Sequence, residues 1–324
     1  MVAKSLLFRL CMVLLALSSI DGNECVKKLT FHVHSPLTKF PFGAAYSQQV
    51  YVAFLHPLNF FESWQECNIN GGYLASIESP AEQALVEKAM AKARNQTAVY
   101  YVGGTAIGRD GRWMWIGLNK EFAHRGYRNF YHDELNNISR GQNCLTVGNW
   151  DKPNRGKWDE LECTTKCVCV CVCVCDRFNV LSLSGATDAK YKYVAILQPS
   201  TFFEAWQDCN IKGGHLASIE SPQEQARVEK AMAKARDPRA VFFFGGTDLG
   251  RKGRWMWIHS NKPIGNGGYT NFFPGQPDNG GGSQDCLTVG VADGYNRGKW
   301  DDQNCLYRLD GYICAFKSPS SSAS

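Results

Sequence analysis

Five side chains that end in a carboxylate or an amide gather in two short stretches near the C-terminal end of the chain: Gln276, Asp278, Gln284, Asp301 and Asp302. The first three lie in a stretch, 272–286, that is rich in Gly, Pro, Asn and Asp, a composition typical of loops. Cysteines at 286 and 305 bracket the segment that follows. Hard oxygen ligands on a flexible loop suit calcium better than zinc or a redox metal, so we expect a calcium site here.

The chain contains this arrangement twice. A constant offset of 142 residues links the cysteines at 67 and 209, at 144 and 286, and at 163 and 305. An offset that stays constant over such a span indicates two tandem copies of one domain, each large enough to fold alone. We predict domains at 46–175 and 186–318, a linker at 176–185, an N-terminal segment at 19–45 and a tail at 319–324.

Each copy has the same predicted elements. In the second copy a strand at 191–197 precedes a helix that Thr201 caps, with Glu204 three residues on as in a capping box. A second helix begins at Ser221-Pro222, and an aromatic strand follows at 241–244. The alternating tryptophans at 255 and 257 fit a half-buried strand and therefore the core. Helices and strands that share one domain with a long irregular region predict an α+β fold.

Composition limits the functions that the chain can have. The net charge of +5 over 324 residues is small, and the segment Arg251-Lys252-Gly253-Arg254 is interpreted as a solvated turn, so we expect no nucleic acid partner. Residues 1–18 resemble a secretory signal, and no later stretch is long enough for a membrane span. We therefore expect a secreted protein with disulfides. No nucleophile and base recur in both copies, so we do not predict an enzyme.

Several motifs together resemble the C-type lectin family, over residues 46–166 and 186–318. They are Gly-Gly-His-Leu-Ala-Ser-Ile at 213–219, Gln-Pro-Asp-Asn at 276–279, Asp-Cys at 285–286, Lys-Trp-Asp-Asp at 299–302 and Gly-Tyr-Ile-Cys at 311–314. The tandem arrangement after a signal is similar to dual-domain secreted lectins of arthropods. The resemblance implies calcium-dependent binding of glycans, with recognition of microbial surfaces in innate immunity as the use.

The resemblance also implies the disulfide pairs Cys209–Cys314, Cys286–Cys305 and Cys144–Cys163. By the same offset, the partner of Cys67 falls at position 172, which is a valine inside an alternating Cys-Val run at 167–175. The run has three interpretations: a strand with one thiol face, a metal-thiolate site, and a translated TGTGTG repeat, which we prefer. We hypothesise that Cys171 or Cys173 still pairs with Cys67 by proximity.

In this family the calcium ion bridges protein and sugar, and the triplet Gln-Pro-Asp is similar to the galactose-type arrangement. The resemblance implies that Gln276, Asp278, Gln284 and Asp301 contact the sugar and, with Asp302, the ion. Two departures from the family pattern compensate, since Gln284 replaces an acid and Asp301 replaces an amide. Three carboxylates therefore remain, and the charge of the ligand set is a main control on calcium affinity.

The first copy aligns a mannose-like set at the corresponding positions: Glu134, Asn136, Gln142, Asp159 and Glu160. Leu135 stands where the family has proline, and a cis peptide there costs about 2.5–4 kcal/mol. Asn137 begins a glycosylation sequon next to this site, and Asn95 begins another away from it. We expect the first copy to bind weakly or to be structural.

Two functions remain open. One is calcium-dependent glycan binding, and the other is calcium-independent protein binding by a lectin-like module. The oligomeric state does not follow from the sequence.

Overall fold

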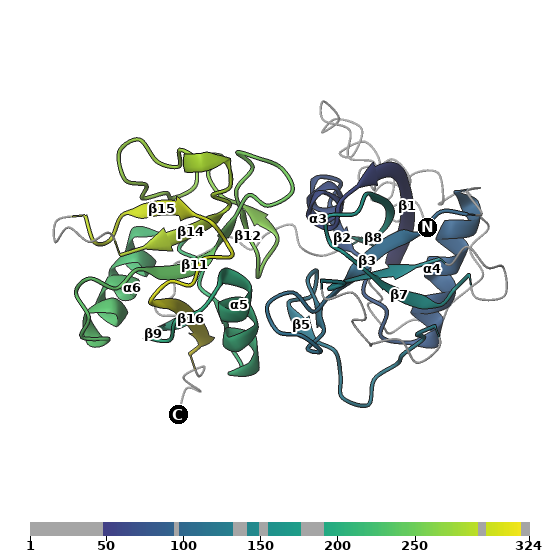
Figure 1. Ribbon diagram of the computed structural model, residues 1–324, viewed down its shortest axis with the longest axis horizontal. Coiled ribbons are helices and arrows are strands. Elements are labelled where there is room, and N and C mark those ends of the chain that lie inside the picture. The colour runs from purple at the N-terminus through teal and green to yellow at the C-terminus, as the bar shows by residue number, and fades with distance from the viewer. Residues whose placement is uncertain are drawn as a thin grey trace, which may run out of the picture.

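The computed structural model describes residues 48–93, 97–131, 141–148, 155–175, 191–290 and 296–318. These residues form two domains that lie side by side, each with two α-helices and one eight-stranded sheet (Figure 1). The predicted α+β architecture is confirmed. The predicted leader, Asn95, Glu134, Asn136 and Asn137 lie outside the described residues. No helix in the described part of the chain has the length and apolarity that a membrane span requires.

Domain 1 contains the first ten elements in chain order. They are β1 (Gln48–Leu58), α3 (Phe60–Ile69), β2 (Gly72–Leu74), α4 (Pro80–Lys92), β3 (Tyr100–Thr105), β4 (Met114–Trp115), β5 (Lys120–Glu121), β6 (Cys144–Val147), β7 (Trp158–Leu161) and β8 (Cys167–Cys175). The sheet runs in the order β1-β8-β3-β4-β5; β2 also pairs with β8, and β6 pairs with both β3 and β7.

Domain 2 repeats this order. Its elements are β9 (Tyr191–Ile196), α5 (Phe202–Ile211), β10 (His215–Leu216), α6 (Pro222–Lys234), β11 (Phe242–Thr247), β12 (Met256–Trp257), β13 (Lys262–Pro263), the 3₁₀ turn η2 (Gly280–Gly282), β14 (Cys286–Val289), β15 (Trp300–Gln303) and β16 (Gly311–Lys317). The sheet order β10-β16-β11-β12-β13 is extended by β9 on β16 and by the β14–β15 hairpin on β11.

The helices begin where the sequence predicts. The side chain of Thr201 accepts the backbone N–H of Glu204, and the Glu204 carboxylate accepts the N–H of Thr201, which completes the capping box of α5. The side chain of Ser221 caps α6 by accepting the backbone N–H of Glu224, with Pro222 at the first helical position. Trp255 and Trp257 are buried as predicted, but the strand there has only two residues and both of its faces are covered.

The structure contains the three disulfides that the resemblance implies: Cys144–Cys163, Cys209–Cys314 and Cys286–Cys305. The hypothesis that Cys171 or Cys173 pairs with Cys67 is confirmed, because Cys67 is bonded to Cys171. The partner position that the constant offset predicts, residue 172, is wrong by one residue. Tyr100 of β3 lies opposite Val168, whereas its counterpart Phe242 lies opposite Gly311. The loop before the last strand is therefore one residue shorter in domain 1, which a constant offset does not reveal.

The alternating Cys-Val run forms β8, and its two residue types face different cores. Cys169, Cys171 and Cys173 face the cluster around α3, whereas Val168 and Val170 face the cluster around α4. The strand with one thiol face is thus the form that the run takes. The sulfurs of residues 67, 169 and 171 lie close together, but two of them are bonded to each other, which argues against a metal-thiolate site. The origin of the run in a translated repeat stays a prediction.

The two domains pack through a pseudo-two-fold interface built from α3 and α5. The rings of Phe61 and Phe203 stack near its centre, with centroids 5.5 Å apart. Trp64 Nε1 donates to Asn261 Oδ1 at 2.8 Å, and Trp206 Nε1 donates to Asn119 Oδ1 at 2.5 Å. Each contact thus has a partner related by the internal repeat, as in the isologous interface of a homodimer.

Two buried glutamines extend the same symmetry. Gln65 Nε2 donates to the carbonyls of Leu249 and Arg254, and Gln207 Nε2 donates to those of Ile107 and Arg112. One hydrophobic cluster contains residues from both helices and both sheets, so a core is shared between the domains. We conclude that the two domains form one packed unit.

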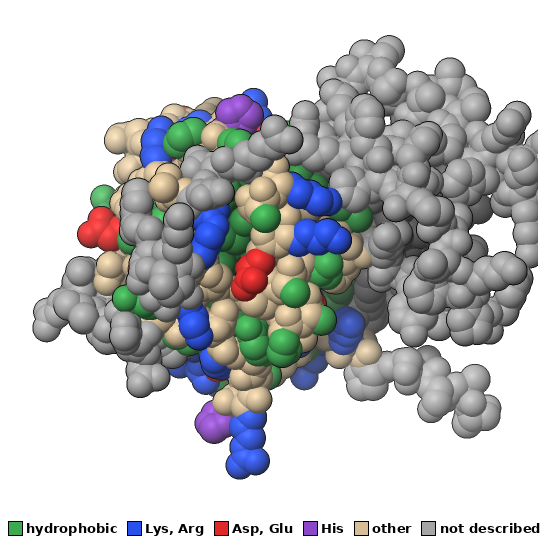
Figure 2. All heavy atoms as spheres, turned by 90° about the vertical axis from the view of Figure 1, so that its right-hand side faces the viewer, with side chains coloured by type: hydrophobic (Ala, Val, Ile, Leu, Met, Phe, Trp, Pro, Cys, Tyr) green, Lys and Arg blue, Asp and Glu red, His purple; other side chains and the backbone are tan. Residues whose placement is uncertain are grey.

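The described residues on the outer face of domain 1, away from the interface, show mixed charge. Figure 2 shows basic side chains spread over several places on this face, with acidic and hydrophobic side chains between them. The described residues visible on this face therefore form no single-sign patch that would indicate a strongly charged partner.

We predict different reactivity for Cys167 and Cys169, the free thiols among the described side chains of β8. Burial raises the pKa of Cys169 to about 12, and burial also raises the pKa of Cys167, which is less deeply buried. Because the thiolate is the nucleophile, alkylation of the native protein at pH 8 should modify Cys167 before Cys169. Peptide mass spectrometry measures the order, and both should react after denaturation. Equal native rates would show that Cys169 is accessible.

We also predict that Gly250→Ala separates the domains. A Cβ at Gly250 would lie 2.3 Å from the backbone carbonyl of Phe61 across the interface. Gly253→Ala is the matched control, because Gly253 also has a positive φ but has no other atom within 4 Å of the added Cβ. The control should cost about 1–2 kcal/mol, because its Cβ is held at a positive φ. Gly250→Ala should lower the thermal midpoint further and increase the radius of gyration in X-ray scattering; equal behaviour of the two variants would contradict the prediction.

Candidate ligand loop of domain 2

The five predicted side chains of domain 2 lie on one loop and on the strand beneath it. Gln276, Asp278 and Gln284 belong to the segment that leads into β14, and Asp301 and Asp302 lie on β15. The Gln276–Pro277 peptide is cis. The β14–β15 pairing and the disulfide at its end hold the two stretches at a fixed register.

Asp302 organises the loop from below. Its side chain is completely buried, and its two carboxylate oxygens accept the backbone N–H groups of Asp278, at 3.1 Å, and Asn279, at 2.8 Å. Charge-assisted hydrogen bonds of this kind are about twice as strong as neutral ones. The carboxylate therefore joins β15 of the β14–β15 hairpin to the residues that directly follow the cis peptide.

The other oxygens lie around the glycine turn. A Cβ added to Gly280 would be 2.7 Å from Gln284 Oε1 and 3.4 Å from Asp278 Oδ1, so both side chains lie next to this residue. Asp278 Oδ1 accepts the backbone N–H of Gly280 at 2.9 Å. Gln284 Oε1 is buried and has no hydrogen-bond partner in the described structure. Buried acceptors normally have a partner, so this atom is a candidate ligand for a bound group.

The carboxylates are close enough to influence one another. Burial raises the pKa of Asp301, the backbone N–H of Asp302 opposes this effect, and the negative charges of Asp302 and Asp278 raise the pKa further. A cation placed among these groups would remove both the repulsion and the desolvation penalty. The donor set, with three carboxylates and two amides, fits calcium chemically.

The corresponding part of domain 1 is only partly described. Thr146 lies opposite Asp159 and Leu145 opposite Glu160, the same register as in domain 2. Gln142 is also described, in the segment that directly precedes β6. The β6–β7 base of the first copy is thus retained, while its remaining predicted site residues lie outside the described residues.

Sequence reasoning missed one residue that contacts the loop. The interpretation of 251–254 as an exposed turn holds for 251–253, but it did not include the ion pair of Lys252, whose Nζ lies 2.5 Å from Asp285 Oδ1. No local sequence pattern predicts this contact, because Lys252 and Asp285 are 33 positions apart and the whole β12–β13 hairpin lies between them.

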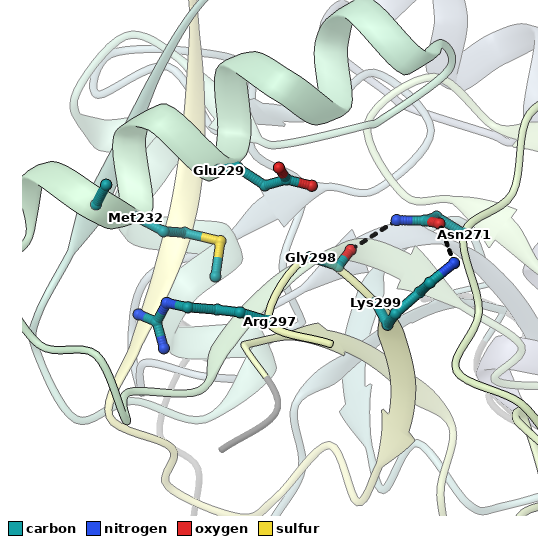
Figure 3. A pocket seen from close by; sticks show the side chains of 7 residues that line it. Glu229, Met232, Asn271, Arg297, Gly298 and Lys299 are labelled. Carbon is teal, nitrogen blue, oxygen red and sulfur yellow. Dashed lines mark hydrogen bonds between the residues drawn. The ribbon is translucent and has the colours of Figure 1, made fainter. Parts of the chain in front are cut away.

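A cavity of about 300 Å³ lies at the base of the loop, between α6 and the segment that enters β15 (Figure 3). Asn271 Nδ2 donates to the carbonyl of Gly298 and Lys299 Nζ donates to Asn271 Oδ1, both at 2.8 Å. Glu229 accepts from a glutamine of α6, and Arg297 donates to two carbonyls of the turn after α6. These polar groups already have hydrogen-bond partners. We therefore interpret the cavity as part of the packing contact between the base of the loop and α6.

The chain thus contains two tandem domains, and in each of them a disulfide lies at the end of a two-stranded hairpin. The Lectin C-type domain matches residues 56–173 and 198–316. The chain therefore belongs to the C-type lectin family.

The relatives found by sequence are lectins and related proteins, and each matches about the length of one domain. Perlucin of Haliotis laevigata is 33% identical over 115 residues, which is 36% of this chain and 69% of perlucin. Salivary C-type lectin 2 of Aedes albopictus is 28% identical over 135 residues, covering 40% of this chain and 86% of that protein. Among solved structures, the carbohydrate-recognition domain of cow CD23 has 27% identity and a TM-score of 0.34, and the match covers 40% of this chain and 91% of that one.

We predict that Asp302→Asn loosens the loop without unfolding domain 2. An amide offers one oxygen where the carboxylate offers two, so one of the N–H groups of Asp278 and Asn279 loses its acceptor. An unmade hydrogen bond of a buried group costs about 1–3 kcal/mol. Hydrogen exchange of these two amides, measured in EDTA, should accelerate. Asp310→Asn is the control, because Asp310 accepts a single backbone N–H away from the loop; equal acceleration at 278–279 in both variants would overturn the prediction.

Proposed function

We propose that this protein binds glycans through a calcium ion held by domain 2. The ligands are Gln276, Asp278, Gln284, Asp301 and Asp302, the same residues that the sequence indicated. The observation that carries the proposal is the convergence of Asp278 with the unpartnered, buried oxygen of Gln284 beside Gly280. Membership of the C-type lectin family supports carbohydrate as the ligand class.

Each side chain has a role that follows from its chemistry. A calcium ion supplies a positive centre that can accept lone pairs from two neighbouring sugar hydroxyls. Carboxylates such as Asp278 and Asp301 accept the hydroxyl protons, and the amides of Gln276 and Gln284 donate to the hydroxyl oxygens. Asp302 is buried below the loop and orients the backbone at 278–279.

The order of acid and amide favours a galactose-type preference in domain 2. Gln276 precedes the cis proline and Asp278 follows it, so one hydroxyl meets an amide on one side and an acid on the other. The exchanged pair Gln284 and Asp301 retains one amide and one acid for the second hydroxyl. We assign domain 1 a structural role or a weaker, mannose-like site.

We further propose that the protein is secreted and takes part in recognition of microbial or host glycans. Four disulfides among the described residues favour an oxidising compartment. No enzymatic activity is proposed, because the loop holds ligands for a cation and a sugar and no nucleophile with a matched base.

We predict that Asp301→Ala abolishes calcium-dependent retention on a galactose resin, because the site loses a carboxylate that contacts both the ion and the sugar. Asp159→Ala is the matched control: it changes the counterpart residue of domain 1, which has the same register and the same hydrogen bond to the following N–H. Elution volumes with calcium and with EDTA measure the effect. The control should keep most of its retention.

A glycan array read with and without calcium tests the sugar class. Binding that disappears in EDTA and favours terminal galactose supports the proposal. Retention that survives EDTA, or no glycan binding at all, would favour a calcium-independent protein ligand instead.

A further inference from the structure

The ammonium group of Lys252 lies among oxygens of the ligand loop. Its Nζ is 2.5 Å from Asp285 Oδ1, 2.8 Å from Asn279 Oδ1 and 3.1 Å from the carbonyl oxygen of Gln284. A lysine ammonium has three N–H donors and no acceptor. The three donors of the ammonium group therefore match three acceptors of the loop.

The acceptors come from both ends of the segment 279–285, so the ammonium closes that segment. Asn279 Oδ1 also accepts the backbone N–H of Gln284 at 3.1 Å, which gives the closure a second link. The segment contains the η2 turn and Gln284, whose buried side-chain oxygen has no hydrogen-bond partner in the described structure. Its conformation decides where that oxygen lies.

The turn that carries Lys252 is itself anchored. Asp248 is almost completely buried; its Oδ2 accepts the N–H of Gly253 at 2.8 Å, and its Oδ1 lies 4.0 Å from the ammonium. The backbone N–H of Asp248 donates to the carbonyl of Asp285 at 3.1 Å. Two acids on different segments thus face one cation, which lies outside the proposed calcium ligand set.

The internal repeat provides a comparison within the chain. At the positions of Asp248, Lys252 and Asp285, domain 1 has Ala106, Asp110 and Asn143. The backbone is otherwise alike in the two domains. The hydroxyl of Thr247 donates to the carbonyl of Asp285, and the hydroxyl of Thr105 donates to that of Asn143, both at 2.7 Å. The cation and both of its acidic partners are therefore exchanged together, as expected if the three side chains form one functional set.

We propose that Lys252 is a positioning residue: its ammonium serves as a built-in cation that holds segment 279–285 in the ligand-ready conformation before calcium enters. This inference rests on the proposed calcium site of domain 2 for its functional consequence. An ordered loop lowers the conformational cost of binding, because less freedom is lost when the ion arrives.

A purely electrostatic role makes the opposite prediction. A positive charge near a calcium site repels the ion, so a lysine that acted only through its charge would weaken calcium binding, and its removal would tighten it. A positioning lysine strengthens binding, and its removal weakens it. The sign of the change in calcium affinity therefore separates the two roles.

The test compares Lys252→Met with Lys262→Met in the full chain. Methionine keeps much of the side-chain length and removes the ammonium in both variants. Lys262 is exposed on β13, and its ion pair with Glu220, at 3.7 Å, does not involve the loop. The control thus removes the same charge from the same domain without touching segment 279–285.

Hydrogen exchange in EDTA gives the first readout, and it needs neither calcium nor sugar. In Lys252→Met, exchange at 279–285 should be about fivefold faster, the size expected for a half-exposed ion pair. The control should leave it unchanged, and Lys252→Arg should restore part of the protection. Unchanged exchange in Lys252→Met would overturn the inference.

Calorimetric titration with calcium gives the second readout. Weaker binding by Lys252→Met than by the control supports positioning, and tighter binding overturns it. If the unmodified protein binds no calcium, the proposed function fails, and the exchange experiment alone decides whether Lys252 orders the loop.

Discussion

The buried carboxylate of Asp302 is the constraint on which the ligand loop depends. It is completely shielded from solvent, yet it accepts two consecutive backbone N–H groups of a loop that has little regular structure. A buried carboxylate without such donors would be strongly unfavourable. If the loop moved away from the sheet, the buried carboxylate would therefore lose both of its hydrogen-bond donors. The disulfide at the hairpin end and the cluster around Lys252 then restrict what remains free.

The second organising feature is the way in which the two copies use each other as a partner. Helices α3 and α5 each present one aromatic ring, one indole N–H and one buried glutamine to the opposite domain. The domains thus share a core that neither would complete alone. A duplicated domain can keep a self-complementary surface in this way, because both halves of the contact are encoded by the same ancestral residues.

Local chemistry allowed much of the fold to be predicted. Capping residues such as Thr201 and Ser221 place helix starts, and the cysteine offset identifies the tandem copies. The candidate ligands of domain 2 stay a prediction, although the structure does place Asp278 and Gln284 next to the same glycine. The contact of Lys252 was not predicted, because it joins segments that only the tertiary fold brings together. The same holds for Gln65 and Gln207, which look like ordinary helix residues, and for the one-residue difference in loop length that places Cys171, and not residue 172, next to Cys67.

The pseudo-two-fold arrangement has a consequence for how ligands would be presented. In Figure 1, β15 lies in the upper half of domain 2, whereas β7 lies in the lower half of domain 1. The second strands of the two hairpins therefore lie on opposite sides of the packed unit in this view. If both copies held a glycan next to these strands, the two glycans would face different surfaces of the chain, an arrangement suited to bridging two particles and not to clamping one of them.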